Sequence, residues 1–385
     1  MAAHHTHTVP ETPRDNGPGP DSGVTSVISG KYLVLSILLS LTSMGVLIYL
    51  TYSPGLFDRL YWNRTPGLFI ALFVVCLRIW FLSMKIRYLS EQRLSWVASL
   101  RVVLCWEFTS SITPSTIGGG PMATYVMTRE KLSLGQSSAI VIYGIMLDQL
   151  LLVFIIPLLV LLGVFFAVIP ENAGWAGHGA MFLIYMALLG YALFLTYGVF
   201  RDPALLKRTV NFVFSMPLLR KYRYKIAREA EKLEEYSHEL RKKPKSFLYK
   251  AFGLSTLAWL AKMSLPAIVI LSFVPADVVL SFLRSMAMTL AGMFMPTPGG
   301  SGGVEGLYAL FIGPLMERRE FLGIAVFMWR IISFYTLVGA GMMAMSWYLN
   351  VKIVETKNNR NEKRSGAGNP SANTGQADTD RHRPG

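Results

Sequence analysis

MPTPGGSGGVEG, residues 295–306, places two prolines and five glycines among twelve positions of an otherwise apolar region. The apolar stretch LRSMAMTLAGMF (283–294) comes before it and LYALFIGPLM (307–316) comes after it. Proline and glycine interrupt regular backbone, and a carboxylate, Glu305, stands at this interruption. Within a membrane, irregular backbone is tolerated only where protein buries it or where it lines a water-filled cavity. If its surroundings cross a membrane, the stretch therefore marks a cavity or a tight contact between helices.

The composition places this chain among membrane proteins. Its mean hydropathy is +0.41, hydrophobic residues make up 52% and charged residues only 16%, against about 25% charged in soluble domains. A helix needs roughly 20 apolar residues to cross a bilayer. The sequence therefore predicts an all-α polytopic membrane protein with about six full transmembrane helices: Tyr32–Tyr52, Gly67–Met84, Ser138–Val168, Met181–Phe200, Phe247–Phe273 and Phe321–Leu349.

The net charge of +14 is unevenly distributed, which predicts the orientation of the chain and argues against binding of nucleic acid. Residues 201–250 hold 14 Lys and Arg against 6 Asp and Glu, whereas residues 170–180 hold no Lys or Arg. By the positive-inside rule, a basic helical loop over 201–246 is cytoplasmic and the second loop lies outside. We therefore expect a multi-pass protein of the cell inner (cytoplasmic) membrane, with a transmembrane domain over 31–350. The same orientation places both termini, 1–30 and 351–385, in the cytoplasm. Their composition predicts that they are disordered.

This orientation predicts how residues 295–306 and their flanking segments lie in the membrane. Residues 276–316 begin and end on the outer side, so they are expected to dip in as a re-entrant helical hairpin, Val278–Phe294 down and Val304–Leu315 up. A second Pro/Gly break, ITPSTIGGGPMATYVM (112–127), follows the apolar stretch 95–111 and is approached from the cytoplasmic side. Setting Pro114 on Pro296 also aligns glycines of the two breaks. Two broken hairpins of opposite orientation predict an inverted repeat, as in many transporters.

TPSTIGGGPMATYVM, PTPGGSGGVEG and the later WRIISFY resemble the paired motifs of the lysylphosphatidylglycerol synthetase transmembrane-region family of flippase-like membrane proteins. The resemblance covers roughly residues 30–350. It implies movement of an aminoacylated or other anionic phospholipid, or of a polyprenyl-phosphate-linked lipid, across the bilayer. The best-understood members also carry a synthetase domain, which we do not expect in the short tail after residue 350, so a separate lipid-synthesising enzyme is a candidate partner.

The glycines of both breaks are candidates for binding a lipid phosphate, because consecutive amide N–H groups at a helix N-terminus suit phosphate oxygens. The alternative is that they only let helices cross closely. The candidate residues are Gly299, Gly300, Ser301, Gly302 and Gly303 on one side, and Pro114, Gly118, Gly119 and Gly120 on the other.

Charged residues inside the predicted spans are the other candidates for substrate binding, because each costs roughly 2.5–3.5 kcal/mol at a helix centre. Asp148 and Arg330 occupy matching positions of the two units and could form a central ion pair, or Arg330 could bind the phosphate. Glu305, close to the start of its helix, favours the positive end of the helix dipole. It either caps the hairpin or faces the substrate.

Lys262 and Glu107 are further candidates for the substrate site, in WLAKMSL and CWEFTS. Arg78 and Arg101 are expected to reach the cytoplasmic face with their long side chains instead.

Enzymatic functions are the alternatives to translocation. Residues 299–303 form a G-x-S-x-G pattern, but a hydrolase of this kind needs a preceding strand and a histidine base. We expect no catalytic residue, cofactor or metal site. Translocation of a lipid headgroup through a groove between the broken helices is the leading hypothesis. An integral-membrane transferase for a lipid-linked sugar or amino acid, and a non-catalytic partner of a lipid synthetase, remain as alternatives.

Overall fold

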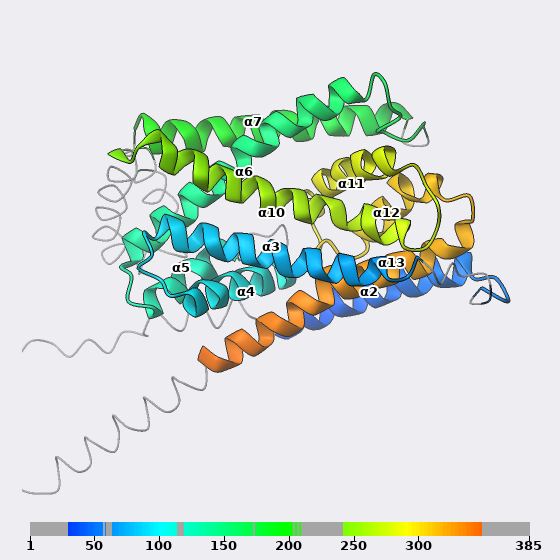
Figure 1. Ribbon diagram of the computed structural model, residues 1–385, viewed down its shortest axis with the longest axis horizontal. Coiled ribbons are helices and arrows are strands. Elements are labelled where there is room, and N and C mark those ends of the chain that lie inside the picture. The colour runs from blue at the N-terminus through cyan, green and yellow to red at the C-terminus, as the bar shows by residue number, and fades with distance from the viewer. Residues whose placement is uncertain are drawn as a thin grey trace, which may run out of the picture.

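The structure is a computed structural model that describes residues 30–56, 58, 64–113, 119–171, 174–202, 205, 208 and 242–348. These residues form a bundle of helices and contain no strand (Figure 1). Apart from Gly30, the predicted terminal tails lie outside the described residues, as do most of the basic loop 201–246, Pro114 and Gly118.

Six helices of the described part are long and apolar enough to cross a membrane, which confirms the all-α polytopic prediction. The first five are α2 (Gly30–Thr51), α3 (Gly67–Leu89), α6 (Leu134–Leu162), α7 (Gly174–Phe200) and α10 (Lys245–Leu271). The sixth span begins with η4 (Arg319–Phe321), continues through α13 (Leu322–Arg330) and the π-helical η5 (Ile331–Tyr335), and remains helical over 336–348.

Shorter helices flank the two Pro/Gly breaks. The first pair is α4 (Trp96–Ile112) and α5 (Gly119–Arg129), and the second is α11 (Val278–Gly292) and α12 (Gly303–Phe311), followed by the 3₁₀ turn η3 (Gly313–Leu315). The members of each pair pack against each other. The predicted helix–break–helix arrangement is therefore present twice, whereas a re-entrant course through the bilayer stays a prediction.

Local sequence explains where several of these helices begin. The Ser95 hydroxyl accepts a hydrogen bond from the Ala98 N–H at 3.1 Å and caps α4. Ser133 and Gln136 form a reciprocal capping box at the start of α6. The Asp277 side chain accepts from the Leu280 N–H at 2.7 Å and caps α11. Each cap satisfies a backbone donor that the first turn of a helix cannot pair internally.

The chain contains two units of matching element order. The alignment that sets Pro114 on Pro296 also sets the end of α3 at Leu89 on the end of α10 at Leu271. In the same alignment the start of α4 falls on the start of α11, and the end of α5 falls on the end of α12. The units α3–α6 and α10–α13 therefore repeat the same succession: a long helix, a broken pair and another long helix.

The first helices of the two units run antiparallel, as an inverted repeat requires. A Cβ placed on Gly67 would lie 2.3 Å from the Ser272 hydroxyl, so the start of α3 abuts the end of α10. At the other end the rings of Tyr88 and Phe247 stack with centroids 4.6 Å apart. Figure 1 shows α3 and α10 side by side. This arrangement supports the predicted inverted repeat.

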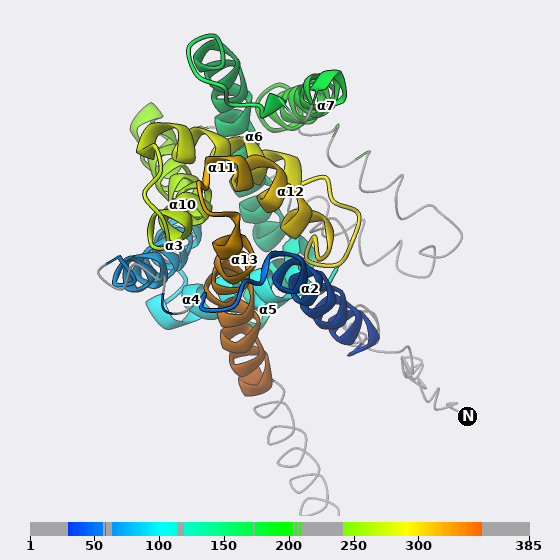
Figure 2. The same cartoon turned by 90° about the vertical axis from the view of Figure 1, so that its right-hand side faces the viewer.

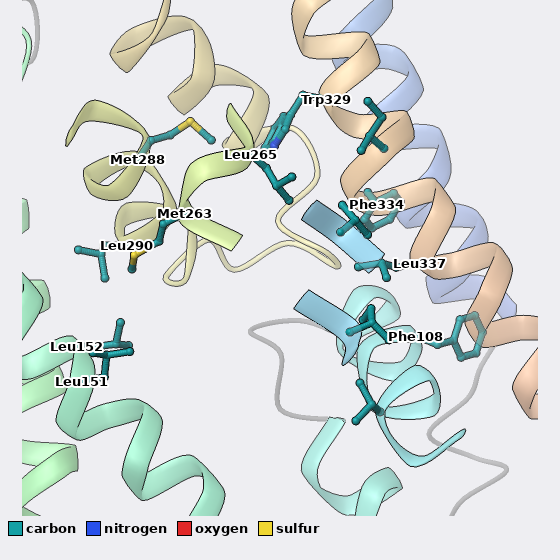
Figure 3. Close-up of a cluster of buried hydrophobic side chains, with 14 of the residues drawn as sticks. Phe108, Leu151, Leu152, Met263, Leu265, Met288, Leu290, Trp329, Phe334 and Leu337 are labelled. Atoms are coloured by element: carbon teal, nitrogen blue, oxygen red, sulfur yellow. The ribbon is translucent and has the colours of Figure 1, made fainter. Parts of the chain in front are cut away.

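The last span forms the middle of the apolar core. Its side chains Trp329, Phe334 and Leu337 are buried among residues from other helices, including Phe108 of α4 and Leu265 of α10 (Figure 3). α2 lies along this span, and α7 packs on α6 at the periphery (Figures 1 and 2).

Small residues allow the closest helix approaches. A Cβ on Gly323 would lie 2.7 Å from the Cα of Ile48 in α2, and one on Gly341 would lie 2.3 Å from the Cβ of Phe108. Membrane helices associate largely through such close backbone packing, since lipid supplies no hydrophobic force between them.

Candidate functional site

The second break is a tight turn whose amide groups are already used. Gly299, Gly300 and Gly302 have φ angles of +60°, +68° and +87°, which residues with a side chain rarely adopt. Successive N–H groups of the break donate to carbonyls of the break or to the side chain of Glu305: those of Gly300, Ser301, Gly302, Gly303 and Val304. The glycine run is therefore built as a folded turn, and these amides are not free for a phosphate.

Glu305 and Arg330 form a fully buried ion pair next to this turn. Arg330 Nε lies 2.7 Å from Glu305 Oε1, and the two side chains are 4% and 0% exposed. The Ser40 hydroxyl of α2 donates to the same carboxylate oxygen at 3.0 Å, and the Gly302 N–H donates to Oε2 at 2.7 Å. The carboxylate therefore has the capping role predicted for it and also neutralises a cation from the last span, whereas a substrate-facing role stays a prediction.

The surroundings of Arg330 hold its side chain in this position. Nη1 lies 3.5 Å from the Gly299 carbonyl oxygen, and the guanidinium carbon lies 4.8 Å from the centre of the Phe334 ring. Nη2 is buried and has no hydrogen-bond partner among the residues that the structure describes. The π-helix η5 begins at the next residue, Ile331, and such segments often occur at functional sites.

The second break touches the helix that leads into the first. A Cβ on Gly299 would lie 2.6 Å from the Ser111 carbonyl oxygen, and the Ser36 hydroxyl of α2 donates to that same oxygen at 3.4 Å. On the other side of the first break, Gly119 packs against the Trp106 ring of α4. The last turn of α4 therefore links both breaks.

A second group of charges comes from α3, α4, α6 and α10; α3 packs against each of the other three helices, and α10 also packs against α6. Arg78 Nη2 lies 2.8 Å from Glu107 Oε1, and Lys85 Nζ lies 2.8 and 2.9 Å from the two oxygens of Asp148. Lys262 of α10 lies within electrostatic range of this group. We call these five residues the polar cluster.

The cations Arg78 and Lys85 of the polar cluster are buried, whereas its carboxylates keep some exposure. The side chains of Arg78 and Lys85 are 9% and 4% exposed, whereas those of Glu107 and Asp148 are 19% and 17% exposed. The cluster also lies one helical turn from the breaks, because the Ser111 hydroxyl donates to the Glu107 carbonyl oxygen at 2.8 Å. The cluster is therefore adjacent to the contact between the breaks.

Two predictions about individual charges are wrong. Asp148 and Arg330 do not pair, because each finds its counter-ion, Lys85 or Glu305, within its own repeat unit. Arg78 does not reach the membrane surface, since its guanidinium binds Glu107 inside the bundle.

Other residues had a less direct sequence signal. Lys85 is not among the predicted substrate-binding residues, although its spacing of two helical turns from Arg78 places both on one face of a helix. Arg101 is half-buried, lies 3.6 Å from Glu130 and covers the Trp347 ring. A Cβ placed on Gly120 of the first break would lie 3.4 Å from the Val141 side chain and 3.9 Å from that of Ile145, both in α6.

A cavity of ≈ 410 Å³ lies at one end of the bundle, lined by Glu91, Arg93, Lys242 and Lys243. None of the predicted substrate-binding residues lines it. At the second break, in contrast, Ser301 and Glu305 are completely buried. The side chains of Ser301 and Glu305 at the second break are therefore closed off from solvent.

The fold and the polar cluster define a polytopic helical membrane protein with ionisable side chains held between its spans. The chain belongs to the family described as Lysylphosphatidylglycerol synthase TM region, which it matches over residues 33–341. It is also similar to a UPF0104 membrane protein of Archaeoglobus fulgidus, with 22% identity over 330 residues that cover 82% of this chain and 97% of that protein. No solved structure matches this chain significantly.

Proposed function

We propose that this protein moves a lipid with a polar headgroup from one leaflet of the membrane to the other. The observation that carries the proposal is the polar cluster, which places charged side chains of four helices together within a membrane bundle. Ionisable residues at membrane depth are rare and usually mark a pathway for a substrate or an ion. Both carboxylates of the cluster, Glu107 and Asp148, remain partly exposed, so a polar headgroup can approach the cluster.

The position of the polar cluster supports this proposal. In many transporters with inverted repeats, the substrate site lies where broken helices of the two units meet. Here the Gly299–Ser111 contact joins the two breaks, and Glu107 lies one turn away along α4. A headgroup at the cluster would therefore be next to the contact between the two breaks.

The Glu305–Arg330 pair fits a role in holding the second break closed. Its carboxylate joins α2, α12 and the last span through Ser40, Gly302 and Arg330. For Arg330 to bind a phosphate directly, its guanidinium would have to leave Glu305. The pair is therefore better suited to stabilise one conformation than to receive the substrate in that conformation.

The orientation proposed from charge places the basic loop 201–246 and both termini in the cytoplasm. A single cysteine introduced at Lys243, near the start of α10, should then react with a membrane-impermeant maleimide only after cells are permeabilised. The test uses a background in which Cys76 and Cys105 are replaced by serine. Labelling in intact cells would reverse the proposed orientation.

The function is tested by lipid movement in proteoliposomes. The protein is reconstituted with fluorescent phospholipids that differ in headgroup, and the fraction reached by a membrane-impermeant quencher is followed over time. We expect wild-type protein to accelerate movement of at least one lipid, and Arg78→Met to slow it at least about tenfold by leaving the Glu107 charge unpaired. Lys243→Met, which removes a cation from an exposed ion pair, is the control and should move lipid at the wild-type rate.

Two results would overturn the proposal. One is wild-type protein that moves no lipid of the panel, with or without an imposed ion gradient, although it is folded and correctly inserted. The other is an Arg78→Met rate equal to that of Lys243→Met, which would remove the polar cluster from the pathway.

A further inference from the structure

The polar cluster has an excess of positive charge. Its cations are Arg78, Lys85 and Lys262, and its anions are Glu107 and Asp148. Each carboxylate already holds one cation at 2.8 Å. The five side chains therefore carry a net charge of +1, and the remaining cation is Lys262.

Lys262 has no carboxylate within ion-pair distance among the described residues. Its ammonium group instead lies 4.8 Å from the centre of the Trp259 ring, one turn earlier on α10. A cation–π contact is worth roughly 0.5–2 kcal/mol, which does not neutralise the charge. The Lys262 side chain is half-buried, and its positive charge is only partly compensated.

Lys262 is also too far from the ends of its helix to place its charge in the headgroup region. Its helix α10 begins at Lys245 and ends at Leu271, so several turns separate Lys262 from the first residue and more than two turns separate it from the last. At the rise of an α-helix these separations are about 25 Å and 13 Å. A lysine that only served packing would reach the interface or carry its own carboxylate partner, and Lys262 does neither.

We propose that Lys262 is the binding residue for an anionic phosphate of the lipid headgroup, so that the transported lipids carry net negative charge at the headgroup. This inference rests on the proposed function and specifies its substrate class. The Lys262 ammonium would donate hydrogen bonds to the phosphate oxygens and bring the occupied cluster to neutrality. Glu107 and Asp148 keep Arg78 and Lys85 engaged, which leaves one cation for one anionic group.

The same arrangement discriminates between headgroups. A cationic headgroup meets a cluster that is already positive and gains no partner for Lys262. A zwitterionic headgroup brings a phosphate but also an ammonium group, which the three cations of the cluster would repel. Net-anionic phosphate lipids are therefore favoured over both, in binding and in movement.

The test measures binding separately from transport. The thermal unfolding midpoint of purified protein in neutral detergent is followed while phosphatidylglycerol, phosphatidylcholine, a phosphate-free cationic lipid or inorganic phosphate is added. We expect phosphatidylglycerol to raise the midpoint at the lowest mole fraction of the three lipids. Lys262→Gln should weaken this effect roughly 10- to 100-fold, the range for a hydrogen bond to a charged group.

Two further variants control for structure and for charge. Lys262→Arg keeps the cation and should retain most of the response, whereas a merely structural loss in Lys262→Gln would not be restored by arginine. Lys250→Gln removes an exposed cation from the same helix and should respond like wild type.

The outcomes for the inference and for the function are distinct. The inference is overturned if phosphatidylcholine or the cationic lipid binds as well as phosphatidylglycerol, or if Lys262→Gln binds like wild type. It is also overturned if inorganic phosphate alone shifts the midpoint as strongly, because the site would then take a free anion. If phosphatidylglycerol binds through Lys262 but no lipid moves in proteoliposomes, the binding site stands and translocation is refuted.

Discussion

Replacing Arg330 by methionine removes the only ion-pair partner that the described residues give to Glu305. The carboxylate is 0% exposed and would keep only the hydrogen bonds from the Ser40 hydroxyl and the Gly302 N–H. Methionine fills a similar volume, so the variant tests the charge and the hydrogen bond of Arg330 more than its packing. The buried carboxylate would have to remain ionised without a counter-ion or take up a proton.

The magnitude follows from this geometry. Removing one partner of a buried ion pair costs about 3–5 kcal/mol, because the other charge stays buried. Glu305→Gln should cost a similar amount by leaving Arg330 unpaired. In the double variant no charge remains, the amide oxygen of glutamine can still accept from the Gly302 N–H, and its NH2 group can donate to the Ser40 hydroxyl. We expect the double variant to lose roughly 1–2 kcal/mol, so the two single effects should be non-additive by at least about 2 kcal/mol.

The assay is equilibrium unfolding in mixed micelles, followed by tryptophan fluorescence. Trp329, one of eight tryptophans, lies beside the pair, with its ring centre 5.5 Å from the Arg330 guanidinium carbon, and contributes to this signal. Lys243→Met breaks the exposed pair with Glu91 and should cost no more than about 1 kcal/mol. The reasoning is refuted if Arg330→Met costs no more than Lys243→Met, or if the single effects simply add in the double variant.

The remaining predictions concern close packing and the polar cluster. Gly299→Ala should lower the free energy of unfolding by more than about 2 kcal/mol, since it combines a φ of +60° with a Cβ 2.6 Å from a carbonyl oxygen. Gly306→Ala, where a Cβ meets nothing within 4 Å, should be neutral or stabilising in the same titration. Gly341→Ala should separate the last span from α4 and reduce the yield of monodisperse protein, whereas Gly339→Ala should leave the elution profile unchanged. Lys85→Met should destabilise the protein by about 3 kcal/mol in mixed micelles because its carboxylate partner stays largely buried; a loss below about 1 kcal/mol would show that the pair is effectively solvated.

Much of the fold could be predicted because the membrane imposes strong constraints on sequence. The six spans appear as apolar runs of sufficient length, and the structure has helices at all of them. The helix–break–helix pairs could be recognised because proline and glycine cannot continue a regular helix without cost. Boundaries were less accurate. The predicted span Gly67–Met84 ends more than one turn before α3 does, since Lys85 and Arg87 interrupt the apolar run but not the helix.

The pairing of charges was only partly predictable. Glu305 could be assigned to a capping position from its place after the glycines, because a capping interaction is local in sequence. Its counter-ion, 25 residues away, could not be identified in the same manner. The alignment of the two breaks matched Asp148 with Arg330, but equivalent positions of two inverted units do not meet unless both lie on the symmetry axis.

The sequence by itself determined that this protein is a bundle of membrane-length helices with two broken pairs in matching positions, because chain length, hydropathy and backbone-breaking residues act locally. Only the tertiary structure decided which charges neutralise one another. It joins Arg78 to Glu107, Lys85 to Asp148 and Arg330 to Glu305, and among the described residues it leaves Lys262 without a carboxylate. The physical reason is that an ion pair requires atoms within about 4 Å, and that distance depends on how helices remote in sequence pack against one another.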